Sequence, residues 1–304
     1  MLEAKEAYLK VEDEIKRHIA GKKEVVELLF ISLVANGHVL LEGVPGVAKT
    51  TMTKALADTM QADFKRIQCM PDLVPSDIIG NVVIDENGEP KLIQGPIFTN
   101  ILLMDELNRS PPRTMSAFLE ALEERQVTLG GKDIPLPKPF MAIATQNPLR
   151  VEGTEPIPKV LADRFLMRVE VTYPSMEEEE EMLRIKNENE KTETKRIITK
   201  NDILDMQKQS QAIGFPKDIS EYVTRLVSES RKEMHVVMGA SPRADIAFLQ
   251  CGKAKALIEG RTEVSKEDIT FLAKPILSHR IVVRSTGGIG VNGIIDGILA
   301  TLNA

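Results

Sequence analysis

Residues 39–51 constrain most strongly what this chain can fold into. A short apolar run at residues 39–41 predicts a buried strand, a turn rich in glycine and proline follows, and residues 52–60 have a helical pattern. A strand, a loop with exposed N–H groups and a helix N-terminus together make an anion-binding site. Gly43, Lys49 and Thr50 match the phosphate-loop template G-x-x-x-x-G-K-[ST]. We therefore predict that Lys49 reaches the phosphates of a nucleotide and that the Thr50 hydroxyl binds Mg²⁺.

The loop departs from the template at one position. Ala48 stands where the second glycine is expected, and we expect alanine to fit there only if its φ angle is negative, as at the start of a helix. An ordinary turn between a strand and a helix is the alternative for this stretch alone. The predicted nucleotide-binding residues are Gly43, Val44, Pro45, Gly46, Val47, Ala48, Lys49, Thr50 and Thr51.

Two adjacent carboxylates end a second apolar run, at residues 101–104. Such a run is typical of a central parallel strand that is buried on both faces. The carboxyl end of that strand lies at the edge where α/β sheets bind ligands, although acidic residues also end strands without any function. Beside a phosphate loop, Asp105 is expected to hold Mg²⁺ together with Thr50. Glu106 is expected to be the base that activates the attacking water.

An amide side chain follows the next predicted strand, at residues 140–145. Asn147 precedes Pro148 and should lie at the same edge of the sheet as Glu106. There it could orient the attacking water and contact the terminal phosphate. The alternative is an asparagine that only turns the chain before a proline, which is common.

Two arginines occupy positions that invite a functional interpretation. Arg164 lies at a junction between a helix and a strand, and Arg243 lies in the first turn of a helix whose predicted cap is Ser241. A cation at a helix start opposes the helix dipole. Both residues could simply be surface arginines. The alternative is phosphate binding, with Arg164 offered as a finger to the nucleotide of a neighbouring subunit.

Two hairpins interrupt the predicted α/β core. Residues 81–84 and 90–93 flank an Asn-Gly turn, and residues 126–129 and 132–136 flank a Gly-Gly turn. The first hairpin could be a mobile surface loop or a loop that touches a substrate.

The α/β core is predicted to span residues 1–172, and residues 173–304 are predicted to form a smaller, all-helical domain. Proline stops the last strand at Tyr173-Pro174, and no strand pattern follows. Helices are expected at residues 201–211, 218–232, 241–259 and 265–279. Capping pairs are expected at Ser175 with Glu178, Asp218 with Glu221, and Ser265 with Asp268.

Composition excludes several classes of protein. The net charge is −6 and the isoelectric point about 5.5, which argues against broad non-specific binding of nucleic acid. The two cysteines, Cys69 and Cys251, have no metal-ligand spacing. No apolar run approaches the length of a membrane span, and the N-terminus has no signal-peptide pattern, so we expect a cytoplasmic protein.

The motifs GVPGVAKT, ILLMDE, ATQNP, LADRF and GASPRA stand in the order found in AAA+ ATPases. In detail the chain resembles the MoxR family, which typically carries alanine before the Walker A lysine. The resemblance implies that residues 43–51 are Walker A and that Asp105 and Glu106 are Walker B. It also implies that Asn147 is sensor 1, Arg164 the arginine finger and Arg243 sensor 2, which would tie the helical lid to the nucleotide state.

The resemblance further implies ATP and Mg²⁺ as ligands, assembly into hexamers with the site between subunits, and hairpin inserts that line or border a pore. The finger could instead be one of four other arginines expected on the phosphate side of the core: Arg109, Arg113, Arg125 and Arg150. MoxR-like proteins act on protein clients as chaperones for maturation or cofactor insertion, often with a separate partner that carries a von Willebrand factor A domain. A nucleic-acid motor, as in helicase rings of the MCM type, and a nucleotide-switched scaffold with little turnover are the alternatives.

Overall fold

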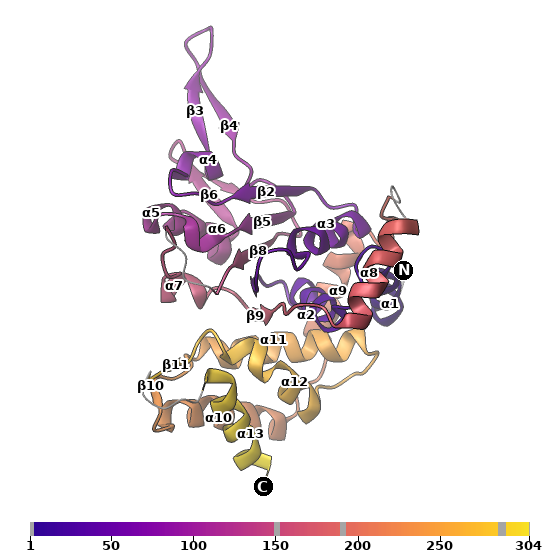
Figure 1. Cartoon of the computed structure of the whole chain (residues 1–304). Coiled ribbons are helices and arrows are strands. Elements are labelled where there is room, and N and C mark those ends of the chain that lie inside the picture. Colours follow the sequence, from indigo (N-terminus) through magenta and orange to yellow (C-terminus); the bar gives the residue numbers. More distant parts are fainter. Residues whose placement is uncertain (1–2, 149–152, 189–192, 285–289, 304) are drawn as a thin grey trace.

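Five strands form one parallel sheet. The computed structural model describes residues 3–148, 153–188, 193–284 and 290–303 (Figure 1). The five strands are β1 (Val39–Glu42), β2 (Phe64–Gln68), β5 (Ile101–Asp105), β8 (Met141–Gln146) and β9 (Met167–Glu170), and their order in the sheet is β2-β5-β8-β1-β9. Because all five are parallel, their carboxyl ends share one edge of the sheet, here called the carboxyl edge, and their amino ends share the opposite, amino edge.

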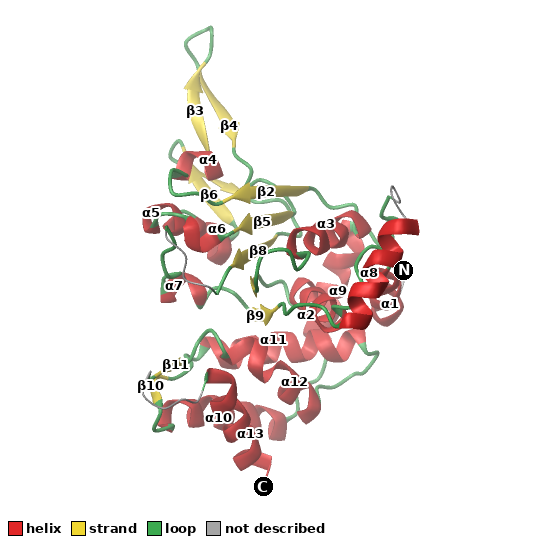
Figure 2. Cartoon of the chain, in the orientation of Figure 1, coloured by secondary structure: helices red, strands yellow, loops and turns green. Residues whose placement is uncertain are grey.

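Helices cover both faces of this sheet (Figure 2). One face packs against α2 (Lys23–Val34) and α3 (Lys49–Thr59), and α1 (Ala4–Lys16) packs against these two helices. The other packs against α5 (Pro112–Ser116), α6 (Phe118–Glu124) and α7 (Lys159–Ala162). Successive strand residues alternate between the two apolar clusters, so that Leu40 lies in one while Val39 and Leu41 lie in the other. Burial on both faces explains why the central strands read as continuous apolar runs.

Both predicted hairpins are present, as β3 (Gly80–Ile84) with β4 (Pro90–Gln94) and β6 (Gln126–Leu129) with β7 (Lys132–Pro135). The first follows the short helix α4 (Pro75–Ile79) and projects away from the core (Figure 1). Four large apolar side chains along it are at least 38% exposed: Val82, Val83, Ile84 and Ile93.

The C-terminal region is helical with one addition that the sequence did not predict. Its helices are α8 (Met176–Glu188), α9 (Lys200–Ala212), α10 (Lys217–Lys232), α11 (Arg243–Ile258), α12 (Lys266–Leu277) and α13 (Val291–Asn303). The expectation that no strand occurs here is wrong, because β10 (Val236–Met238) pairs antiparallel with β11 (Val282–Val283). Strands of three and two residues are too short to show a periodic pattern. In the described part of the chain, no helix has both the length and the apolar character needed to cross a membrane.

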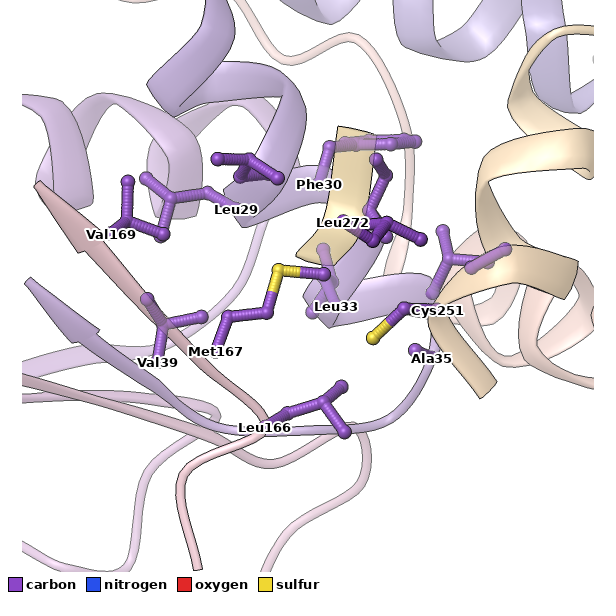
Figure 3. Packing of buried hydrophobic residues seen from close by; sticks show 14 of the residues in the cluster. Leu29, Phe30, Leu33, Ala35, Val39, Leu166, Met167, Val169, Cys251 and Leu272 are labelled. Atoms are coloured by element: carbon purple, nitrogen blue, oxygen red, sulfur yellow. The ribbon is translucent and has the colours of Figure 1, made fainter. Parts of the chain in front are cut away.

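One apolar cluster joins the helical region to the core (Figure 3). Leu29 and Leu33 of α2 and Met167 of β9 share it with Cys251 of α11 and Leu272 of α12, and all five are at most 1% exposed. The C-terminal helical region, here called the lid, therefore packs against α2 and β9 of the core.

Some predicted helix starts need correction. The Ser175–Glu178 and Ser265–Asp268 capping pairs are present. Ser110-Pro111-Pro112 also predicts a helix start, with Ser110 as the N-cap. This prediction is wrong, because Pro111 occupies the N-cap position of α5. The predicted Asp218 cap is also wrong, since α10 begins one residue earlier, directly after Pro216. In both places a proline, whose φ is fixed near its preferred value, occupies the N-cap position itself.

His38 joins β1, β8 and α6 at the amino edge of the sheet. It is 2% exposed at the amino end of β1, its Nδ1 accepts a hydrogen bond from the Ala142 N–H at 3.0 Å, and its Nε2 donates to the Leu122 carbonyl at 3.0 Å. Burial lowers the pKa of His38 to about 3, with the Arg125 charge acting in the same direction. The imidazole is therefore neutral in the folded protein at neutral pH.

Replacing His38 should destabilise the protein in a pH-dependent way. The unfolded chain gains a proton at His38 below pH of about 6.5, whereas the folded chain does so only near 3, so this residue's contribution falls as the pH drops through that window, by about 1.4 kcal/mol per unit. We expect His38→Ala to lower the free energy of unfolding at pH 7 by roughly 2–4 kcal/mol, because two buried backbone groups lose partners. Urea titrations should show that difference narrowing toward pH 5. A difference that is constant with pH would contradict this assignment.

Candidate active site

The loop between β1 and α3 lies at the carboxyl edge of the sheet. Gly43 leaves the strand so close to β9 that an added Cβ would lie 2.3 Å from the Val171 carbonyl oxygen. Gly46 has φ of +88°, where glycine is favoured, and α3 begins at Lys49. The loop borders a cavity of about 400 Å³, lined by Pro45, Gly46, Ala48, Lys49, Thr50, Thr51, Asp105, Glu106, Thr145 and Asn147. The structure thus brings together the predicted loop, both predicted acids and the predicted amide.

Ala48 does not have the expected negative φ. It lies in the left-handed region, with φ of 61° and ψ of 21°, at the N-cap of α3. The expectation was wrong because the chain reverses into α3 at this residue, and a left-handed residue at the end of a loop makes that turn. The conformation costs a non-glycine residue about 1–2 kcal/mol, which the packing of the loop against β9 must offset.

Lys49 points back into its own loop. Its ammonium group donates to the Gly43 carbonyl. Burial lowers the pKa of Lys49, while the carboxylates of Asp105, Glu106 and Glu42 oppose that shift. The three acids thus favour the charged ammonium, which is the form that binds phosphate oxygens.

Asp105 and Thr50 present oxygen ligands to the same cavity. The Thr50 hydroxyl donates to Asp105 Oδ2 at 3.4 Å, and the Thr145 hydroxyl donates to Asp105 Oδ1 at 2.6 Å. Asp105 is 8% exposed. A hydroxyl and a carboxylate at the rim of a phosphate loop fit Mg²⁺, which prefers a few protein oxygens together with substrate phosphates and water.

Glu106 is held in a strained conformation beside Asn147. Its φ is 58°, unusual for a non-glycine residue, and its N–H donates to the Thr145 hydroxyl at 2.8 Å. Its carboxylate accepts hydrogen bonds from Arg109 Nη1 at 2.9 Å and from Gln68 Nε2 at 3.4 Å. A carboxylate in this place can accept a proton from water near the end of a bound polyphosphate.

Sequence reasoning missed Arg66, which contacts a predicted metal ligand. Its Nε and Nη2 lie 3.0 Å and 2.6 Å from Asp105 Oδ2. Arg66 and Gln68 lie on the same face of β2, whose neighbour in the sheet is β5. The available signal was two long polar side chains, two residues apart, at the carboxyl end of an edge strand.

The two remaining predicted residues lie elsewhere. Arg164 precedes β9, at the amino edge, and lines a second cavity of about 650 Å³ together with Arg243, the first residue of α11. None of the residues lining this cavity lines the cavity of the phosphate loop. Both arginines pair with Glu123, Arg164 Nη1 at 2.8 Å and Arg243 Nη2 at 2.7 Å.

The four arginines named as alternative fingers do not share one location. Arg109 lies on the phosphate side, paired with Glu106, and Arg113 is exposed on α5. Arg125 does not lie there: it donates to the carbonyls of Phe140 and Asn36, which precede β8 and β1 at the amino edge. That expectation was wrong because Arg125 follows α6 and not a strand end. Arg150 lies outside the described residues.

Comparison with known proteins agrees with the α/β core and the helical region described above. The model of the ATPase family associated with various cellular activities (AAA) matches residues 38–167, and the AAA lid domain model matches residues 228–289. The Bacillus subtilis protein YeaC is 40% identical, covering 96% of this chain and 93% of its own. Chaperone MoxR1 of Mycobacterium tuberculosis is 39% identical, covering 89% of this chain and 74% of its own. The crystal structure of a candidate ATPase from Cytophaga hutchinsonii has a TM-score of 0.90 and 38% identity, covering 98% of this chain and 94% of its own.

Removing Arg66 should ease metal binding if Asp105 is a Mg²⁺ ligand, since the ion pair competes for the same oxygen. A partly exposed pair is worth about 0.5–1 kcal/mol, so we expect Arg66→Ala to lower the Mg²⁺ concentration for half-maximal nucleotide binding about two- to fivefold. Calorimetric titration of ATP at stepped Mg²⁺ concentrations measures this. Arg113→Ala is the matched control and should leave the value unchanged. An unchanged or higher Mg²⁺ requirement in Arg66→Ala would contradict competition at Asp105.

Proposed function

This chain belongs to the MoxR family of AAA+ ATPases, and we propose that it hydrolyses ATP to drive the remodelling of a protein client. The observation that carries the ATPase proposal is the meeting of Lys49, Thr50, Asp105, Glu106 and Asn147 around one cavity at the carboxyl edge. A cation, a hydroxyl, two acids and an amide are the groups that phosphoryl transfer to water requires.

Each residue has a distinct part in the proposed reaction. Lys49, freed from the Gly43 carbonyl, binds the phosphate oxygens, and the loop from Gly43 to Thr51 surrounds the phosphates. Thr50 and Asp105 would hold Mg²⁺, which when bound neutralises phosphate charge and orients the terminal phosphate. Glu106 takes a proton from the attacking water, and Asn147 fixes that water's position.

The arginines are proposed to act on a neighbouring subunit. The strands are parallel, so residues that precede β9 lie at the opposite edge from residues that follow β1. A head-to-tail contact between copies brings the amino edge of one to the carboxyl edge of the next. Such contacts close into a ring when the rotation between copies divides a full turn. Arg164 and Arg243 would then stabilise the charge that develops on the neighbour's nucleotide. By family resemblance we propose a hexamer.

The features of the projecting hairpin β3–β4 favour a protein as the client. Its exposed apolar residues, Val82, Val83, Ile84 and Ile93, offer a surface that binds apolar segments. Its turn carries the acids Asp85, Glu86 and Glu89, which would repel a phosphate backbone and so disfavour the nucleic-acid alternative. By resemblance the client is a protein complex under maturation, and a separate von Willebrand factor A domain protein is a partner.

Glu106→Gln should retain ATP binding and lose turnover. The amide keeps the size of the side chain but cannot accept the proton, so we expect kcat to fall at least about 100-fold with little change in nucleotide affinity. Phosphate release and calorimetry measure the two quantities. Lys49→Ala is the comparison, in which affinity itself is lost. Wild-type turnover in Glu106→Gln would remove this residue as the base.

Mixed rings test whether the arginines act across the interface. Arg164→Ala and Glu106→Gln subunits each spoil a different half of a shared site, so mixing them should restore turnover at interfaces that combine an intact acid with an intact arginine. We expect activity above the sum of the two separate variants, and likewise for Arg243→Ala. Well-formed mixed rings with no gain would contradict action in trans.

A further inference from the structure

Glu123 lies between the two arginines and holds both. Its Oε1 accepts a hydrogen bond from Arg243 Nη2 at 2.7 Å, and its Oε2 accepts one from Arg243 Nη1 at 3.2 Å. Arg164 Nη1 forms an ion pair with the same Oε2 at 2.8 Å. One carboxylate thus bridges an arginine of the core and an arginine of the lid. The hydrogen bond with Arg243 lowers the pKa of Glu123, so the bridge is charged at neutral pH.

Arg164 depends on this contact for its orientation. Among the ion pairs of the described residues, Glu123 is its one acidic partner within 4.0 Å, and its Nε is buried without a hydrogen-bond partner. Arg243 has a second acid, Asp163, but at 3.8 Å. Two guanidinium groups this close repel each other unless an anion lies between them.

The lid does not need Glu123 to stay in place. Arg280, 5% exposed, donates to Asp163 Oδ1 at 3.0 Å and to the Phe165 carbonyl at 2.9 Å. The Ser241 hydroxyl donates to Asp163 Oδ2 at 3.1 Å. These bonds, together with the shared apolar cluster, fasten the start of α11 to the segment before β9. Removal of Glu123 should therefore disturb the arginines without detaching the lid.

Glu123 is also tied to the second hairpin. It lies on α6, three residues before β6. Glu120, on the same helix, accepts hydrogen bonds from the Thr128 N–H at 3.0 Å and the Thr128 hydroxyl at 2.7 Å. These bonds join hairpin β6–β7 to α6, the helix that carries Glu123.

We propose that Glu123 is a positioning residue that holds Arg164 and Arg243 as a single two-arginine unit and sets this unit according to the position of hairpin β6–β7. This inference rests on the proposed action of both arginines on a neighbour's nucleotide. A displacement of the hairpin by a client would shift the arginines, and hydrolysis in the adjacent subunit would change with it.

The test compares Glu123→Ala with the matched control Glu124→Ala, which removes the next acid on the same helix. Misplacing a charge-stabilising group by about 1 Å costs roughly ten- to a hundredfold, so we expect kcat of Glu123→Ala to fall by that factor while the KM for ATP and ring assembly change little. Glu124→Ala should behave as wild type. Glu123→Gln should resemble Glu123→Ala, since its amide N–H₂ would face a guanidinium donor. Glu123→Asp keeps the charge and should be partly active.

A double-mutant comparison separates positioning from a structural role. In a chain that already carries Arg164→Ala and Arg243→Ala, the further change Glu123→Ala should have no effect on kcat. An additional loss of tenfold or more there, or wild-type kcat in Glu123→Ala alone, would overturn the inference. If Glu123→Ala fails to fold, the same comparison is made with Glu123→Gln.

Mixed rings distinguish this inference from its premise. Glu123→Ala mixed with Glu106→Gln should recover turnover as Arg164→Ala does, because the Glu106→Gln subunit supplies an intact arginine pair. Recovery with Arg164→Ala but not with Glu123→Ala would overturn the role of Glu123 and leave the proposed function standing. No recovery with either variant would overturn the action in trans itself, and the inference with it.

Discussion

The parallel alignment of five strands is the constraint on which the rest of the structure depends. It sends the loop after β1, the acids that end β5 and the amide that follows β8 to one edge of the sheet. It sends the segment before β9, with Arg164, to the opposite edge. A single chain therefore cannot bring Arg164 to its own phosphate loop without dismantling the sheet. We therefore propose that a second copy completes the catalytic set, by placing its amino edge against the carboxyl edge of the first.

Charged groups at both edges are paired within the single chain. At the carboxyl edge Arg66 pairs with Asp105, and Arg109 pairs with Glu106. At the amino edge Glu123 pairs with Arg164 and Arg243. Pairs that are this exposed contribute about 1 kcal/mol or less, which a bound nucleotide with its metal exceeds easily. The two carboxyl-edge pairs can therefore exchange partners when nucleotide and metal bind, whereas Glu123 is proposed to keep its two arginines together.

Sequence predicted the parts of the site that depend on local order along the chain. Asp105 ends an apolar strand and Glu106 follows it, while Lys49 and Thr50 begin the helix after the loop that follows β1. The carboxyl edge of the sheet then determines where these residues meet. The hairpins were predictable because Asn-Gly and Gly-Gly turns fix them locally. Arg66 and Glu123 were not, because their partners lie 39 and 120 residues away along the chain. The positive φ of Ala48 was missed because alanine disfavours that conformation and only the packing around the loop imposes it.

The most direct measurement is a structure of the assembled ring with ADP and a γ-phosphate mimic bound at Lys49. We expect the guanidinium groups of Arg164 and Arg243 from one subunit to lie within hydrogen-bonding distance of the mimic held by the next. A mimic contacted by Arg164 of its own chain, or by neither arginine of either chain, would contradict a site shared between subunits.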